Sequence, residues 1–96
     1  MPNVAVKTEV ETDRGWSFRV AVREDDAAPA SEHELLLSWV DYEHWTHGLA
    51  SPSRVAEVVV TTVRDAKPDL QLPPKFDAST CRRWVRDLDA RVREAL

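Results

Sequence analysis

The sequence is poor in two residue types on which many functional sites depend. It has one cysteine and two glycines among its 96 residues. A single cysteine excludes an internal disulfide and a zinc site built from cysteines. Two glycines, both at expected turns or helix ends, leave no glycine-rich loop of the kind that binds phosphates or dinucleotides. These scarcities exclude several common classes of enzyme and binding domain.

Long hydrophobic segments are also absent. No apolar run approaches the ~20 residues that a membrane-spanning helix requires. The first ten residues alternate between apolar and polar side chains and lack the apolar region of a secretory signal. By default, we therefore expect a cytoplasmic protein with no membrane partner.

What the chain does contain suits one small folded domain at residues 1–96. Hydrophobic residues make up 43% of the sequence and charged residues 31%, which is ordinary for a globular protein. The net charge of −4 is unevenly distributed, because the half 1–50 holds four Lys/Arg against ten Asp/Glu, whereas the half 51–96 holds nine against seven. An acidic first half argues against a protein that mainly binds the phosphate backbone of nucleic acids.

The first part of the chain alternates with a period of two, which predicts β-strands. The expected strands span residues 4–12, 16–23 and 34–40. The first two are joined by Asp13-Arg14-Gly15, a turn in which glycine can adopt a positive φ angle. In the first strand, one face would carry Val4, Val6, Thr8, Val10 and Thr12.

The third expected strand has two apolar faces. Leu35, Leu37 and Trp39 lie on the face that should meet the core. Leu36 and Val40 lie on the other face, which a fully solvated strand would leave polar. Either this strand is partly covered on both sides, or Leu36 and Val40 belong to a contact surface.

Residues 41–47 predict a short helix. Asp41 is suited to cap its first amides, and Gly48 to end it in left-handed geometry. Tyr42 and Trp45 are three residues apart and so share a face. They either form an exposed aromatic patch or close the core where the sheet meets the helices, and this choice stays open for Trp45.

Two longer helices are expected to follow, the first at residues 52–66. Serine caps helices and proline suits their first position, so Ser51-Pro52 is a helix start. The residues behind it, 55–63, are rich in valine, and β-branched residues favour strands. The start signal and the helical spacing favour a helix, but a strand remains the alternative for this segment.

Prolines at 68, 73 and 74 predict a connection before the last helix, at residues 78–95. Asp77 would cap that helix, with Phe76 packed against its first turn. Its buried stripe would consist of Cys81, Trp84, Val85, Leu88 and Val92. The fold class is therefore α+β: a three-stranded antiparallel β-meander, followed by a short helix and two longer helices packed on one face.

A metal site is one hypothesis for the short helix. His44 and His47 are three residues apart, and two imidazoles at this spacing can share an ion with a carboxylate, for which Asp41 and Glu43 are nearby. A further ligand would be needed, for which His33 is a candidate. A small metal-dependent catalyst is our third hypothesis, but no sequence feature defines a nucleophile, since Cys81 lies in the buried stripe. We therefore expect that the protein is not an enzyme and that it binds no cofactor and no metal.

Nucleic-acid binding is the alternative hypothesis. The last helix carries five arginines, of which Arg82, Arg83 and Arg86 are clustered near its start. Arginine matches phosphate geometry well. However, Asp77 and Asp87 flank this cluster, and pairing of arginine with aspartate within the helix accounts for the pattern more simply.

A protein partner, or a second copy of the chain, is the leading hypothesis. A three-stranded sheet has two edges, and an exposed edge can accept another strand. The candidate interface residues beside such an edge are Leu36, Val40, Tyr42 and Trp45. Because exposed aromatic residues are typical interface anchors, we expect a small non-enzymatic protein-interaction or regulatory module.

Several short strings resemble those of a group of small uncharacterised bacterial proteins. They are HELLLS at 33–38, DYEHW at 41–45, the Ser51-Pro52 start with its valine-rich helix, and LPPKFDA at 72–78. The resemblance covers about residues 16–86 and implies an antiparallel sheet that leads into helices with similar starts. It implies no activity, because the group has no assigned function. The segment 10–22 has a weaker likeness, of fold alone, to small antitoxin-type proteins.

Overall fold

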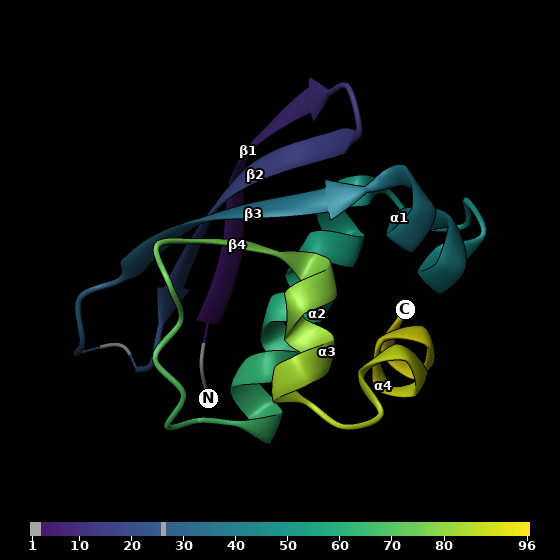
Figure 1. The fold of residues 1–96 in the computed structure, drawn as a ribbon. Helices are drawn as coiled ribbons and strands as arrows, with labels where there is room; N and C mark the ends of the chain where they lie inside the picture. Colours follow the sequence, from purple (N-terminus) through teal and green to yellow (C-terminus); the bar gives the residue numbers. More distant parts are fainter. Residues whose placement is uncertain (1–2, 26) are drawn as a thin grey trace.

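The computed structural model describes residues 3–25 and 27–96. It is an α+β fold, as expected; three strands precede the first helix, and a fourth strand follows the second helix (Figure 1). The strands are β1 (Asn3–Thr12), β2 (Gly15–Arg23), β3 (Ser31–Ser38) and β4 (Lys75–Asp77). The helices are α1 (Trp39–Thr46), α2 (Pro52–Ala66), the 3-10 turn η1 (Ala78–Thr80), α3 (Cys81–Trp84) and α4 (Leu88–Ala95). Among the described residues, no helix is long and apolar enough to cross a membrane.

The sheet has four strands in the order β1-β2-β3-β4. The first three form the predicted antiparallel meander. The fourth, β4, was not predicted and runs parallel to β3 (Figure 1). The chain approaches β4 through Pro73-Pro74, and Glu34 N donates a hydrogen bond to Pro74 O at 2.8 Å. Three residues carry too little alternation to be recognised as a strand in the sequence.

β1 contains a bulge that changes which side chains face the helices. Its register with β2 shifts after Val6, which leaves Lys7 as an extra residue. Beyond the shift, Glu9 turns toward α2 and accepts a hydrogen bond from Ser53 Oγ at 2.6 Å. The uniform alternation predicted for the first strand is therefore wrong beyond Val6, and Val10 is 58% exposed.

The junction between β3 and α1 lies earlier than predicted. Ser38 ends the strand and caps the helix, because its Oγ accepts a hydrogen bond from Asp41 N at 3.1 Å. Asp41 is therefore inside the helix rather than at its cap. Trp39, expected on the core face of a strand at 34–40, is the first helical residue and is 48% exposed. At the other end of α1, His47 and Gly48 both have left-handed backbone, with φ of 53° and 81°.

The valine-rich segment is helical, as the start signal predicted. Ser51 Oγ accepts a hydrogen bond from Arg54 N at 3.1 Å, and Pro52 is the first residue of α2. The buried valines of this helix are Val55, Val58, Val59, Val60 and Val63. Packing of this stripe against the sheet outweighs the weak preference of β-branched residues for strands.

The prediction of a single helix at 78–95 is wrong. Asp77 does act as a cap, since its Oδ1 accepts a hydrogen bond from Ser79 N at 2.9 Å, but the turn it caps is η1. The chain then leaves helical geometry at Val85, which is extended, and at Asp87, whose φ is 64°. α3 and α4 consequently run in different directions (Figure 1). Leu88 is buried on the far side of this break.

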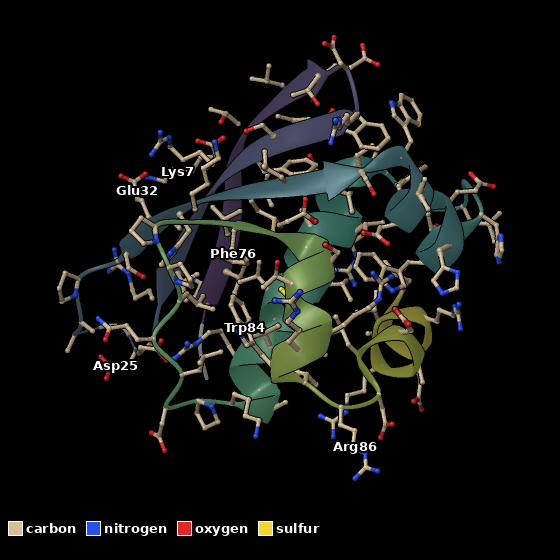
Figure 2. All side chains as sticks on the ribbon, in the orientation of Figure 1. Lys7, Asp25, Glu32, Phe76, Trp84 and Arg86 are labelled. Carbon is tan, nitrogen blue, oxygen red and sulfur yellow. The ribbon has the colours of Figure 1, made fainter. Side chains whose placement is uncertain are left out.

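The core lies between one face of the sheet and the helices. Its fully buried large side chains are Phe18, Val20, Leu35, Leu37, Val55, Val59, Val60, Val63, Cys81, Leu88 and Val92. Trp84, predicted in the buried stripe, is only half-buried and packs beside Phe76, with 5.4 Å between ring centroids (Figure 2). This core fixes the sheet relative to α2 and thereby positions the end of β3, where α1 begins.

Candidate functional site

The four candidate interface residues lie in different environments. Trp45 is only 2% exposed and belongs to the core, which resolves the choice left open by the sequence. Tyr42 is half-buried, and its hydroxyl donates a hydrogen bond to Ala50 O at 2.5 Å. Leu36 is half-buried in β3, and Val40 is 77% exposed at the start of α1. Of the four candidates, only Val40 is exposed, and it lies beside a second exposed apolar residue that the sequence assigned to the core, Trp39.

We call this region the Trp39 surface. It is a shallow depression of about 480 Å³ lined by Trp39, Val40, Glu43, His44 and His47. Sequence reasoning missed Trp39 because it continues the apolar alternation of β3 without interruption. The one available signal was Ser38, a good helix cap placed directly before it.

The Trp39 ring packs against the ring of Trp16, which in turn contacts Tyr42. Its ring centroid lies 4.3 Å from that of Trp16, and Tyr42 meets Trp16 edge-on at 5.0 Å. The backbone of Trp39 is also fixed, since its N–H donates to Arg14 O at 2.8 Å. An exposed tryptophan with this support loses little conformational freedom when a partner covers it.

A deeper groove lies on the other side of the first turn of α1. We call it the end groove; it has a volume of about 550 Å³. Its lining residues are Thr12, Asp13, Arg14, Trp16, Leu36, Leu37, Ser38, Asp41, Asp77 and Ser79. They come from the β1–β2 turn, the end of β3 and the start of η1. The volume lies within the range of about 300–1,000 Å³ that is typical of ligand sites.

Arg82 does not project as a free cation. Its guanidinium is 2.8 Å from Asp41 and 2.9 Å from Asp89, and its central carbon lies 4.8 Å from the centroid of the Trp45 ring. Partial burial opposes the charged form, but the hydrogen bonds to both carboxylates raise the pKa of Arg82 above its ordinary value. This predicted nucleic-acid contact is thus part of a cluster that joins α1, α3 and α4.

The other two candidate arginines, Arg83 and Arg86, are exposed. Arg86 projects into solvent from the turn between α3 and α4 (Figure 2). With Arg82 paired, the predicted cluster of three is reduced to two cations. Two exposed arginines on an acidic chain fall short of the one-sided basic surface that is typical of nucleic-acid-binding domains.

His44 and His47 are not joined by a third metal ligand. Within residues 3–25 and 27–96, no group of three or more His, Cys, Asp or Glu side chains is placed to hold a metal ion. His44 Nε2 accepts a hydrogen bond from Arg93 at 2.7 Å. His33, the other candidate ligand, is buried, and its Nδ1 is bonded to Pro73 O at 2.7 Å. A carbonyl only accepts, so Nδ1 carries the proton and His33 anchors the proline-rich connection.

Cys81 is fully buried, as predicted. Burial raises the pKa of its thiol from 9.0 to about 12, and the nearby charge of Asp77 adds to this shift. Because the thiolate is the reactive form of cysteine, we expect little reactivity of Cys81 at neutral pH.

Both sheet edges carry features that oppose pairing with another strand. β1 has its bulge and the charged side chains of Lys7 and Glu9, and bulges and charges both interrupt edge-to-edge pairing. On the outer face of the sheet, Lys7 Nζ lies 3.8 Å from Glu32 Oε1 (Figure 2). β4 is only three residues long and follows Pro73-Pro74. Addition of a strand, one of the expected binding modes, therefore has weak support.

Comparison with protein-family models, with curated proteins and with solved structures finds no match for this chain. The resemblance to a group of small bacterial proteins therefore stays a prediction. Any function has to be argued from the surface that the fold itself creates, namely the Trp39 surface and the end groove beside it.

Proposed function

We propose that this protein is a small non-enzymatic interaction module that binds a protein partner through the Trp39 surface. The observation that carries the proposal is the placement of Trp39, which is 48% exposed although it rests on the buried ring of Trp16. Tryptophan is among the residues that contribute most to binding when a partner covers it. Its neighbour Val40, 77% exposed, extends the apolar area.

The surroundings of Trp39 have the layout of an interface. Glu43, His44 and His47 form a polar border around the apolar pair. Interfaces commonly combine an apolar centre with a polar rim of this kind. Cytoplasmic residence is part of the same proposal, and the low cysteine content suits it.

A peptide-display selection tests the proposal. A phage-displayed peptide library is selected on the immobilised protein, and the recovered peptides are synthesised and titrated. We expect them to bind the Trp39→Ser and Val40→Ser variants at least about tenfold more weakly, a loss of about 1.4 kcal/mol. Val40 contributes nothing to the buried core, so its variant reports on binding even if Trp39→Ser disturbs Trp16.

The matched control is Val10→Ser, because Val10 is also an exposed valine, at 58%, but lies on β1. Peptides that bind all three variants as tightly as the original protein would contradict the proposal. A library that yields no peptide sensitive to Val40→Ser would do the same.

A further inference from the structure

We infer that the partner segment is an extended basic peptide, which places an arginine or lysine in the end groove and an apolar side chain on Trp39. This inference rests on the proposed function and specifies the chemistry of the partner. It starts from the position of the two depressions on opposite sides of the first turn of α1. Ser38 and Asp41 line the groove, whereas Trp39 and Val40 line the surface.

The linings of the two depressions are in contact through one pair of aromatic rings. Trp16 lines the end groove, and its ring contacts Trp39 at a centroid distance of 4.3 Å. A single short segment of chain can therefore reach both. Peptide side chains alternate in an extended conformation, so one residue can enter the groove while a neighbouring residue packs on Trp39.

The groove has an excess of carboxylates. Asp13 comes from the β1–β2 turn, Asp41 from α1 and Asp77 from the end of β4, whereas Arg14 is the one basic residue among those that line it. Asp41 is paired with Arg82 at 2.8 Å and contributes little net charge. The carboxylates of Asp13 and Asp77 then outnumber the guanidinium of Arg14 in the lining, which gives the groove a net negative charge.

The region around the groove is also rich in negative charge. Glu43 lines the adjoining Trp39 surface, and residues 1–50, which supply most of both linings, carry ten acidic against four basic side chains. A negative surface of this kind favours a positive partner and repels an acidic one. Nucleic acid and acidic peptides are therefore poor occupants.

The shape of the groove suits a long basic side chain. Leu36 and Trp16 contribute apolar surface to its lining, and Thr12, Ser38 and Ser79 contribute hydroxyl groups. Arginine and lysine bury their methylene stems on apolar surface while the charged head binds polar groups. Arginine fits a carboxylate with two parallel hydrogen bonds, which makes it the preferred occupant.

Nuclear magnetic resonance titration of the ¹⁵N-labelled protein tests this inference. The probes are two capped pentapeptides, Gly-Leu-Arg-Leu-Gly and its counterpart in which neutral citrulline replaces arginine. We expect the arginine peptide to shift the amide signals of Arg14, Ser38 and Asp77 in a saturable manner. The citrulline peptide, which has the same shape without the charge, should bind at least about fivefold more weakly.

Charge-removing variants complete the test. Asp77→Asn keeps the cap of η1, since asparagine caps helices as well as aspartate does. This variant should bind the arginine peptide at least about threefold more weakly. Asp13→Asn should act similarly. Asp25→Asn is the control, because it makes the same charge change at the opposite end of the sheet (Figure 2), where Asp25 Oδ1 accepts from Ala27 N at 2.8 Å. This control should bind like the original protein.

Several results would overturn the inference. These are equal binding of the arginine and citrulline peptides, shifts confined to another face, no shifts at all, or unchanged binding by both groove variants. Light scattering at two concentrations adds another, since self-association lost in Val40→Ser would assign the surface to a second copy. The proposed function is judged separately: selected peptides that need Trp39 but carry no basic residue would leave it standing and remove only the basic partner.

Discussion

The indole of Trp45 donates a hydrogen bond to Asp89 Oδ1 at 2.6 Å, across 44 residues of sequence. The bond joins α1 to α4, and Arg82 of α3 joins the same carboxylate at 2.9 Å. Three helices therefore meet around one buried tryptophan. Since α1 also carries the Trp39 surface, this polar cluster holds the proposed binding face in position.

Removal of the Asp89 carboxylate should destabilise the fold. Asp89→Ala leaves the buried Trp45 N–H without its acceptor, and an unsatisfied buried donor costs about 1–3 kcal/mol. Urea denaturation followed by tryptophan fluorescence measures this loss. Glu94→Ala, on an exposed position of the same helix, is the control and should stay within about 0.5 kcal/mol. Equal midpoints for the two variants would show that the cluster does not stabilise the protein.

The same carboxylate should make stability depend on pH. Burial opposes ionisation of Asp89, but hydrogen bonds from Trp45 and Arg82 outweigh it and lower its pKa below the ordinary 3.8. When folding lowers the pKa of a carboxyl group, the group stabilises the folded state fully at a pH above its pKa in the unfolded chain. This stabilisation is lost as the pH falls through its pKa in the folded protein. The difference in unfolding free energy between the original protein and Asp89→Asn should therefore shrink below pH 3.8.

The measurement is chemical denaturation of both proteins at several pH values between about 6 and 3. The difference should be constant in the upper part of this range. A difference that stays the same down to the lowest pH would mean that the Asp89 pKa is not lowered by folding.

The sequence predicts well those elements that have clear starts and one-sided faces. β2 and α2 were predicted correctly, because an alternating strand and a capped valine stripe each bury one face. The bulge at Lys7 could not be predicted, because an extra residue leaves the apolar pattern intact and only the pairing with β2 reveals it. The break at Val85 was missed for the same reason, since Val85 and Leu88 fit one helical stripe although the chain turns between them.

The site was predicted only in part. Val40 was recognised because it breaks the expected polar face of β3, but Trp39 was assigned to the core by the same alternation. The end groove depends on elements distant in sequence, and Asp13 and Asp77 are brought together only by the sheet. Pairing of the arginines with aspartates of the last predicted helix was expected, and Arg82 does pair with Asp89. Its second partner, Asp41, was not predicted, because it lies in α1 and is distant in sequence.

Gly15 should tolerate no side chain. A Cβ at this position would overlap the carbonyl oxygen of Leu37 in the neighbouring strand. Gly15→Ala should therefore cost about 3 kcal/mol or more, since overpacking against a fixed backbone forces the strands apart. Gly48→Ala is the matched control: its Cβ would meet open space, and only left-handed backbone strain of about 1 kcal/mol opposes it. Thermal melting of both variants checks the order, and an equal loss would contradict it.

The Cys81 thiol should be unreactive in the folded protein. With a pKa of about 12, almost none of it is thiolate at pH 8, and its side chain is fully buried. Labelling with a thiol reagent should proceed at the rate of unfolding in buffer and rapidly in concentrated urea. Fast labelling of the native protein, with first-order dependence on the reagent, would show that Cys81 is accessible.

Replacement of both exposed histidines tests the metal hypothesis against the interaction hypothesis. His44 is 49% exposed, and its contacts with Arg93 and Asp89 lie at the surface, so the double variant His44→Ala, His47→Ala should lose less than about 1 kcal/mol. Added zinc, nickel or manganese should leave the melting temperature unchanged, because a metal stabilises a fold only in proportion to its binding of the folded state. His33→Ala is the contrasting variant and should cost more, since it removes the buried donor to Pro73 O. Zinc would indicate a metal site on α1 if it raised the melting temperature of the original protein but not that of the double variant. Such a result would also change the proposed role of the Trp39 surface, because these two histidines form its rim.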